Sequence, residues 1–155
     1  MKNSMQDIYI LPFQPENQVE VRDLILAGLV EHWDLLDPGK NPDLNDISSA
    51  YANAVFLVAW YQKRIIGTGA LISKSNNTAE IVRMSVAADM RRNGIGGMIV
   101  RQLCEHAKSS GYKHLILETT ETWDEVIEFY KKFGFYITHR LNGDVYFALD
   151  LYREE

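Results

Sequence analysis

The sequence has little of what marks secreted, membrane or modular proteins. Its one cysteine, Cys104, cannot form an internal disulfide, which fits a reducing compartment. The longest apolar run, residues 54–61, is far shorter than the ~20 residues of a membrane-spanning helix. Residues 1–7 are polar and lack the apolar core of a signal peptide. We therefore expect a cytoplasmic protein that does not enter a membrane.

An excess of positive charge is also missing. The formal net charge is −5 and no basic stripe occurs, which argues against nucleic acid as a partner. No repeat, low-complexity tract or Pro/Gly/Ser-rich linker divides the 155 residues. Hydrophobic residues make up 46% and charged residues 24%, as in globular domains large enough to bury a core. We expect a single domain spanning residues 1–155.

Patterns for metal binding and for a cysteine nucleophile are weak. The histidines show no ligand-type spacing with cysteine or acidic residues, so we expect no metal site. They are His32, His106, His114 and His139. Cys104 lies on the apolar stripe of a predicted helix, which favours a small core residue over an acylated nucleophile.

What the sequence does contain is a strand-like segment, Ile81–Val86, that leads into a glycine-rich helix start. Alternation predicts that Val82, Met84 and Val86 share one side of the strand. The helix start reads Arg91-Arg92-Asn93-Gly94-Ile95-Gly96-Gly97. The first turn of a helix offers unpaired N–H groups and a partial positive charge, and glycines let an anion approach the backbone. This predicts a phosphate site, the plainer alternative being a glycine-rich helix start with solvated arginines.

Three phosphate motifs compete for this stretch. A P-loop requires a lysine after its last glycine, and none follows here. A dinucleotide fingerprint requires a third glycine where Ile99 stands and a place after the first strand, although Glu118 lies roughly where its ribose-binding acid belongs. The third form, Arg/Gln-x-x-Gly-x-Gly, is met in full by Arg91, Gly94 and Gly96.

Periodicity and turn residues outline the other elements. Asn17 and Glu20 form a box-like start for a helix that we expect to end near His32. Asn142-Gly143 is a type I′ turn signal that predicts a final hairpin. The other expected elements are a strand at Ile8–Leu11, an acidic loop at Trp33–Asp46, a helical turn at Ile47–Ala52, strands at Phe56–Tyr61, Ile65–Ile72 and Thr78–Val86, a helix at Gly94–Ser109, a strand at His114–Glu118, and a helix with Trp123, Val126, Ile127 and Tyr130 on one face. The crossover through the Gly94–Ser109 helix implies a parallel strand pair.

Two segments together resemble the GNAT superfamily of acyl-CoA N-acyltransferases. Arg91, Gly94 and Gly96 match its pyrophosphate motif, and Phe129–Phe135 is similar to its second signature, a helix with a tyrosine near the thioester. The resemblance covers residues 56–151, while the N-terminal part agrees in element order. It implies a single-domain N-acetyltransferase of the α/β (α+β) class. The expected sheet is mixed and mostly antiparallel, with six to seven strands, a parallel central pair and about four flanking helices.

The resemblance also implies a cofactor site. The acyl donor would be acetyl-CoA, bound by Met84, Ser85, Val86, Arg91, Arg92, Asn93, Gly94, Ile95, Gly96 and Gly97. In the family, the backbone N–H at the position of Met84 polarises the thioester carbonyl, and the pantetheine arm pairs like an added strand near Val86. Many members carry an asparagine seven residues before the helix tyrosine. That position is Trp123 here, so the asparagine's hydrogen bond to the cofactor is lost.

Acyl transfer to an amine requires a proton acceptor, because an alkyl amine has a pKa of ~10.4 and arrives protonated at neutral pH. Glu80 is the first candidate. It stands fourteen residues before Gly94, as does the glutamate base of the histone-acetyltransferase branch, and alternation places it on the face of Met84. Glu118 matches an acidic position used as the base in the branch that acetylates ribosomal proteins. The choice stays open, and an ordinary solvated glutamate is an alternative for each.

Tyr130 is the candidate proton donor to the leaving sulfur, because a phenol of pKa ~10 is close in acidity to a thiol. Its position on an apolar helix face also fits a plain core aromatic. The resemblance favours the acid.

The acceptor stays open. A small-molecule amine or a peptide amine is expected, shaped by Trp33–Asn53 and by the final hairpin Tyr136–Leu151. The acidity of Trp33–Asp46 would suit a cationic amine, or it marks a solvated loop. A homodimer is open as well, because many family members are dimers. The alternative of a different class is a non-catalytic acyl-CoA-binding sensor or interaction module.

Overall fold

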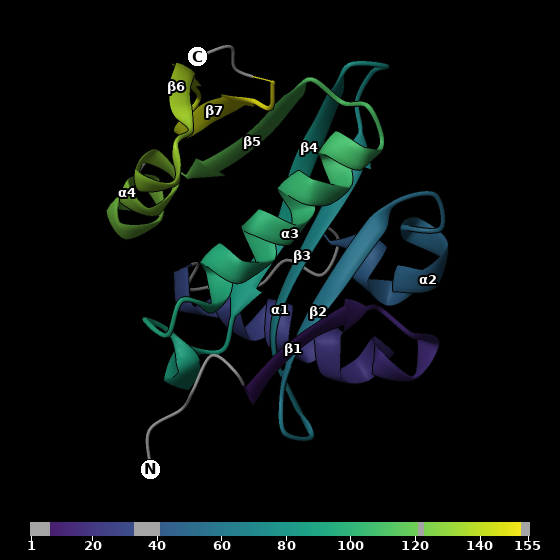
Figure 1. Cartoon of the computed structure of the whole chain (residues 1–155). Helices are drawn as coiled ribbons and strands as arrows, with labels where there is room; N and C mark the ends of the chain where they lie inside the picture. Colours follow the sequence, from purple (N-terminus) through teal and green to yellow (C-terminus); the bar gives the residue numbers. More distant parts are fainter. Residues whose placement is uncertain (1–6, 33–40, 121–122, 153–155) are drawn as a thin grey trace.

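The computed structural model describes residues 7–32, 41–120 and 123–152. Within these ranges seven strands form one sheet in the order β1-β2-β3-β4-β5-β7-β6 (Figure 1). The strands are β1 Ile8–Pro12, β2 Val55–Tyr61, β3 Arg64–Ser73, β4 Thr78–Val86, β5 His114–Thr120, β6 Tyr136–Leu141 and β7 Asp144–Asp150. The α-helices are α1 Gln18–His32, α2 Ile47–Ala50, α3 Ile95–Ser109 and α4 Asp124–Phe133. Only β4 and β5 pair in parallel, so the predicted fold class is confirmed.

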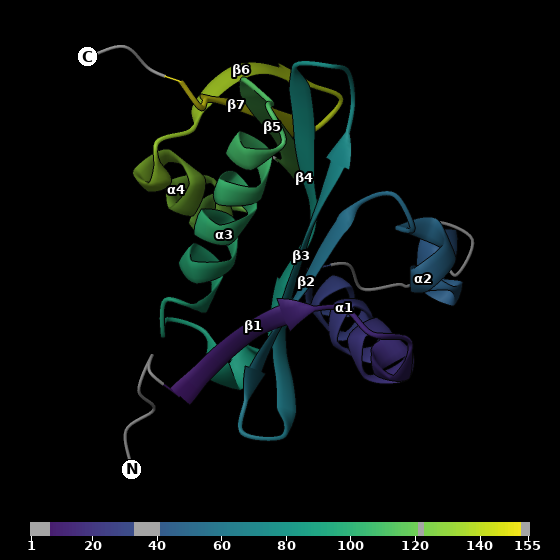
Figure 2. The same ribbon diagram turned by 45° about the vertical axis from the view of Figure 1, so that its right-hand side comes forward.

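The helices cover the sheet unequally. α3 and α4 lie on one face, called here the α3 face, and α1 and α2 lie on the other, the α1 face (Figure 2). The α1-face core joins Val21 and Ile25 of α1 to strands β2 and β3. The larger core joins α3 and α4 to the sheet. Neither α1 nor α2 extends over β5, β7 and β6, and no other helix of the described ranges lies on the α1 face of these three strands (Figure 2). None of the described helices is both long and apolar enough to cross a membrane.

Helix α1 begins differently from the prediction. Asn17 does not cap it in a box with Glu20. A 3-10 turn at Pro15–Asn17 runs directly into α1, and the Asn17 side chain accepts a hydrogen bond from the backbone N–H of Gln14 at 2.8 Å. The Glu20 carboxylate accepts one from the N–H of Ile65 in β3 at 2.9 Å. The expected capping box is therefore absent, and the Glu20 side chain instead makes a hydrogen bond between α1 and β3.

A β-bulge in β4 changes which side chains share a face. Arg83 has a φ of +56°, and the β3–β4 register shifts between Thr68 and Ala70. The bulge interrupts the alternation, so Val82 packs in the α1-face core whereas Met84 and Val86 pack in the α3-face core. The prediction that these three share one side was therefore wrong. Glu80, two residues before Val82 in the regular part of the strand, also lies on the opposite face from Met84.

Strands β4 and β5 form a fork. Their parallel register runs from Thr78↔His114 to Glu80↔Ile116 and stops there, although β4 continues to Val86. The two strands diverge from this point (Figure 1). On its other edge β5 pairs with β7 along its whole length. β7 returns through the predicted turn, in which Asn142 and Gly143 have φ values of +52° and +86°.

Gly69 allows α3 to approach the sheet opposite the bulge. A Cβ atom built on Gly69 would lie 2.5 Å from Cγ2 of Ile99 and 2.7 Å from Sδ of Met84. Such distances are below van der Waals contact, so this position has no room for a side chain.

Replacing Gly69 with alanine should therefore overpack the α3-face core. We expect the free energy of unfolding to fall by about 1–3 kcal/mol, measured by urea denaturation without ligand. Gly97→Ala is the matched control, because its Cβ would meet no atom within 4 Å. In helix α3 that change should instead stabilise by up to ~1 kcal/mol. Equal stability of the two variants would contradict the packing argument.

Candidate functional site

The start of α3 is an uncapped helix N-terminus. Gly94 occupies the N-cap position with a φ of +78°, and no side chain hydrogen-bonds there as a cap. Asn93 instead donates to the carbonyls of Met90 at 2.9 Å and Arg91 at 3.2 Å, which closes the preceding turn. A positive φ is natural for glycine and turns the chain directly into the helix. The first-turn N–H groups therefore keep their capacity to bind an anion.

The two arginines before α3 are not simply solvated. Arg91 makes a bidentate ion pair with Glu31 of α1, with both N–O distances 2.7 Å, and its Nε donates to the carbonyl of Val86 at 3.2 Å. Arg92, with a φ of +66°, lies 3.5 Å from Glu125 of α4, and its side chain is 86% exposed. Arg91 thus braces the loop against α1, whereas Arg92 is available to a phosphate.

The glycines leave space beside this N-terminus. A Cβ on Gly96 would lie 3.5 Å from Cζ of Phe129 and 3.9 Å from Cγ2 of Val86, so the helix start sits between α4 and the end of β4. No atom lies within 4 Å of a Cβ on Gly97. Uncapped N–H groups, an accessible guanidinium and two positions without side chains fit a pyrophosphate group.

Glu80 lies at the point where the fork opens. Its side chain is 14% exposed, and one carboxylate oxygen is 3.6 Å from Nζ of Lys74. Burial raises the pKa of this carboxyl, Lys74 lowers it, and the negative charge of Glu118 raises it again, so that the pKa is above its ordinary value. A carboxylate with a raised pKa accepts a proton more readily than an exposed one.

Glu118 lies near enough to Glu80 for its negative charge to raise the pKa of Glu80. It stands opposite Tyr146 in the β5–β7 register, and the Tyr146 ring stacks on His139 with centroids 4.3 Å apart and planes at 6°. Burial raises the pKa of the Tyr146 phenol first, followed by the carboxylates of Glu118, Asp144 and Glu80. We call Glu80, Glu118, His139 and Tyr146 the open-face cluster, because no helix covers this part of the sheet (Figure 2).

Tyr146 and His139 were missed by the sequence analysis. Their part of the chain was recognised only as a hairpin, because a turn signal fixes the pairing of its two strands and not the strand that the hairpin joins. Nothing in the local pattern indicates that β7 inserts between β5 and β6.

Tyr130 is buried on the α3 face. Its ring centroid lies 5.0 Å from that of Phe129, 5.6 Å from Phe135 and 5.8 Å from Phe147. Burial raises the pKa of its hydroxyl, which keeps the phenol protonated at neutral pH. The residue thus occupies the core position that was one of its two predicted places. Its role as a proton donor stays a prediction.

The acidic loop is only partly described. Asp43 pairs with Arg83, with Oδ1 2.6 Å from Nη2, and the Asp46 carboxylate accepts hydrogen bonds from the N–H and hydroxyl of Ser49 at the start of α2. Asp43 is therefore neutralised by a partly buried partner, whereas Asp46 caps α2 through neutral donors. Residues 33–40, which include Asp34 and Asp37, lie outside the described residues.

The remaining chemical candidates are inert or structural. Burial raises the pKa of the Cys104 thiol to about 11, so it is not a nucleophile at neutral pH. Among residues 7–32, 41–120 and 123–152, no three His, Cys, Asp or Glu side chains gather as metal ligands. Trp123 is the N-cap residue of α4 and makes no side-chain cap bond.

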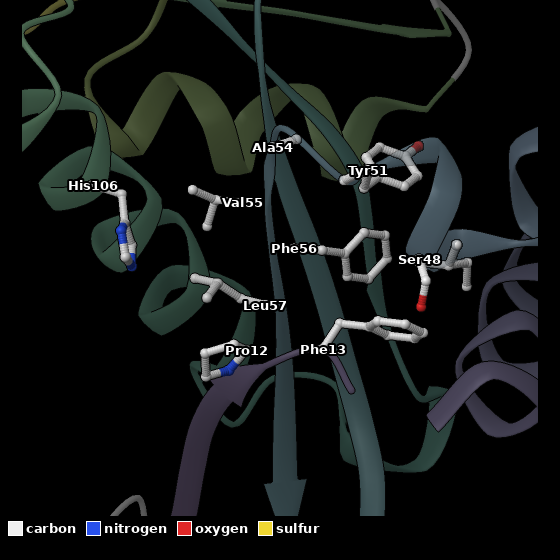
Figure 3. A pocket seen from close by; sticks show the side chains of 11 residues that line it. Pro12, Phe13, Ser48, Tyr51, Ala54, Val55, Phe56, Leu57 and His106 are labelled. Atoms are coloured by element: carbon white, nitrogen blue, oxygen red, sulfur yellow. The ribbon is translucent and has the colours of Figure 1, made fainter. Parts of the chain in front are cut away.

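A cavity of about 390 Å³ lies elsewhere, around the first residues of β2 (Figure 3). Phe13, Tyr51 and Phe56 line one side of it, and His106 of α3 faces it from the other (Figure 3). The Tyr51 hydroxyl is already bonded to Asp43 at 2.6 Å. The lining contains neither a glutamate of the open-face cluster nor a residue of the α3 N-terminus, so this cavity is separate from the fork.

Residues 6–135 match the family model described as the acetyltransferase (GNAT) family. The chain is 28% identical over 120 residues to a probable N-acetyltransferase 14 of Xenopus tropicalis, covering 75% of this chain and 58% of that protein. It is 32% identical over 104 residues to the N-acetylaspartate synthetase of Danio rerio, covering 64% and 37%. The chain thus spans little more than half, or less, of these relatives.

Solved structures share the fold. A GNAT-family acetyltransferase from Staphylococcus aureus superposes with a TM-score of 0.83 at 23% identity, covering 94% of this chain and 99% of the other. The PaiA N-acetyltransferase of Thermoplasma acidophilum, solved in complex with coenzyme A, gives 0.81 at 18% identity, covering 92% and 98%. At these identities the likeness concerns the fold alone.

The proximity of the two glutamates generates a prediction. Glu118→Gln should lower the pKa of Glu80, because a neighbouring negative charge is removed, and Lys74→Met should raise it. Both shifts are measured by NMR titration of side-chain carboxyl carbons. Glu128→Gln, on the exposed side of α4, should leave the pKa of Glu80 unchanged. An unaltered titration in Glu118→Gln would show that the two carboxylates do not interact.

Proposed function

The chain belongs to the acetyltransferase (GNAT) family, and on that basis we propose that it transfers an acetyl group from acetyl-CoA directly to a primary amine. One observation carries the proposal. β4 leaves its pairing with β5 at Glu80 and continues, paired with β3 alone, toward the glycine-rich start of α3. A proton acceptor, an unpaired strand edge and a phosphate site thereby follow one another along a single path.

Several residues would hold the cofactor. The N–H groups of Ile95, Gly96 and Gly97 and the guanidinium of Arg92 would bind the pyrophosphate. The edge of β4 from Met84 to Val86 would pair with the pantetheine arm, because β5 no longer occupies that edge. Bound acetyl-CoA supplies the acetyl group as a thioester with a good leaving group.

Glu80 takes the proton of the incoming amine. The amine arrives as an ammonium group and must lose a proton before it attacks. The carboxylate of Glu80 lies at the fork, and its raised pKa improves its match to this task. Glu118, in the same cluster, keeps a negative charge beside it and thereby supports the raised pKa.

Met84 and Tyr130 act on the thioester, whereas Glu80 acts on the amine. The backbone N–H of Met84 donates to the carbonyl oxygen and stabilises the negative charge that develops there. The phenol of Tyr130 holds a proton for the leaving sulfur. Glu80 and Tyr130 lie on opposite faces of the sheet, and only beyond Glu80, where β4 and β5 are unpaired, does one ligand have access to both.

The acceptor is proposed to lie over the open-face cluster, as a small-molecule or peptide amine. The stacked rings of His139 and Tyr146 lie beside the two glutamates. This supports an amine whose carbon skeleton rests on the rings while its nitrogen reaches Glu80. The cytoplasmic location and the homodimer stay predictions.

Thiol release from acetyl-CoA, scanned over amines, amino acids and peptides, tests the activity. With the best acceptor, kcat should rise with pH as Glu80 loses its proton, with a midpoint above 4.5 because burial raises the pKa. Glu80→Gln should lower kcat by ~10²-fold or more and abolish this rise of kcat with pH.

Glu118→Gln should keep turnover and shift the midpoint of the rise to lower pH. Loss of turnover in Glu118→Gln alone would assign the base to Glu118. A coenzyme A-induced rise in Tm without thiol release from any acceptor would favour a binding module.

Gly96→Leu tests the cofactor site separately. A leucine here would fill the space between the α3 N-terminus, Phe129 and Val86, so the Kd for coenzyme A should rise at least about tenfold by calorimetry. Glu105→Leu, at an exposed position of the same helix, should bind as the wild type does. An unchanged Kd in Gly96→Leu would refute the site assignment.

A further inference from the structure

The bulge in β4 places a non-glycine residue in a conformation that glycine prefers. Arg83 has a φ of +56°, and together with Met84 it stands opposite Gly69 alone. Side chains that are not glycine pay energy for a left-handed backbone, and such residues persist where their surroundings hold them. The structure must therefore contain the contacts that hold Arg83.

The Arg83 side chain is anchored by residues on either side of α2. Its Nε and Nη2 lie 2.9 Å and 2.6 Å from the two carboxylate oxygens of Asp43. Nη2 also donates to the Asn41 side chain at 3.1 Å, and the Tyr51 hydroxyl donates to Asp43 at 2.6 Å. The side chains of Arg83 and Asp43 are only 18% and 24% exposed. This is a partly buried, bidentate pair with a third partner, which is a stronger restraint than a surface ion pair.

Hydrogen bonds keep the Asp43 carboxylate ionised. Burial opposes ionisation of Asp43, but its hydrogen bonds with Arg83 and Tyr51 hold the pKa below its ordinary value. Burial and the neighbouring carboxylate raise the pKa of Tyr51 to about 12, so its hydroxyl stays protonated and donates.

The Arg83 backbone is held independently. Thr68 of β3 is fully buried, and its Oγ1 donates to the carbonyl oxygen of Arg83 at 2.8 Å. That carbonyl belongs to the same planar peptide unit as the N–H of Met84. In a trans peptide the C=O and N–H point in opposite directions. Because β3 and β5 flank β4 on opposite sides, a carbonyl directed at β3 directs the Met84 N–H toward the fork.

We infer that Arg83 is a positioning residue, and that Asp43 is its anchor: together they hold the bulge that points the Met84 N–H at the reacting carbonyl. The inference rests on the proposed function. It also links that N–H to the segment Asn41–Tyr51, which packs on the α1 face. The guanidinium itself does not touch the reacting atoms. It orients the Met84 N–H only through the peptide unit that joins Arg83 to Met84.

Substitution at position 83 separates the backbone conformation from the side chain. Arg83→Ala loses the anchor while still requiring a positive φ, so the bulge should relax. Arg83→Gly loses the same anchor but adopts a positive φ without strain. Arg83→Ala should therefore lower kcat. Arg83→Gly should restore it, although glycine is normally the more destabilising residue in a strand.

The experiment compares kcat and KM for the wild type, Arg83→Ala, Arg83→Gly, Asp43→Ala and the double variant Asp43→Ala with Arg83→Gly. Arg83→Ala and Asp43→Ala should lower kcat roughly 10- to 100-fold, because a misplaced oxyanion donor loses transition-state stabilisation, while the KM for acetyl-CoA changes little. Arg83→Gly should return most of kcat. In that background Asp43→Ala should cost nothing further, since no side chain remains to anchor.

Asp89→Ala is the control. It breaks another bidentate pair, with Arg64 at 2.7 Å, that is exposed and does not contact the bulge. Its kcat should equal that of the wild type. Equal loss in Arg83→Ala and Arg83→Gly, or no loss in Asp43→Ala, would overturn the inference.

A second measurement does not depend on turnover. The amide resonance and hydrogen exchange of Met84 should change in Arg83→Ala and Asp43→Ala and stay at the wild-type values in Arg83→Gly and Asp89→Ala. If the wild type acetylates no acceptor, the proposed function fails, and this pattern alone decides whether Arg83 holds the bulge. The same Met84 signals in all variants would overturn that role.

Discussion

A strand pairs with two neighbours only where its backbone runs alongside both, and the pairing of β4 with β5 ends at Glu80. Everything at the candidate site depends on this loss of pairing. Beyond that point the edge of β4 carries peptide groups with no strand partner on the β5 side, which is unstable unless another group pairs with them. An extended acyl donor supplies such a group. The bulge at Arg83 adds the twist that separates the strands.

Two ion pairs connect this edge to helices on the α1 face. Arg83 is bound by Asp43 ahead of α2, and Arg91, at the start of the phosphate loop, is bound by Glu31 near the end of α1. The ends of α1 and the residues before α2 border residues 33–40 of the sequence. Asp43, one of the carboxylates expected to attract a substrate, holds Arg83 instead.

The sequence was sufficient where a property depends on neighbouring residues. The glycines of α3, the Asn142-Gly143 turn and the order of strands and helices all follow from local backbone preferences, and the structure has them. Two features were not predictable in this way. The bulge inverts the face of Met84 because of contacts from Thr68 and Asp43, which lie far away in the chain. Glu20 bonds to β3 rather than to its own helix for the same reason.

The open-face cluster distinguishes the two glutamates, between which the sequence did not decide. Both lie at the mouth of the parallel pair, but Glu80 is the more buried, and burial and the negative charge of Glu118 raise its pKa. Two carboxylates this close favour a state in which one of them holds a proton at higher pH than usual. The less solvated member takes that proton. This supports the proposal that Glu80 is the base and Glu118 the charge that tunes it, an arrangement that depends on depth in the sheet rather than on residue type.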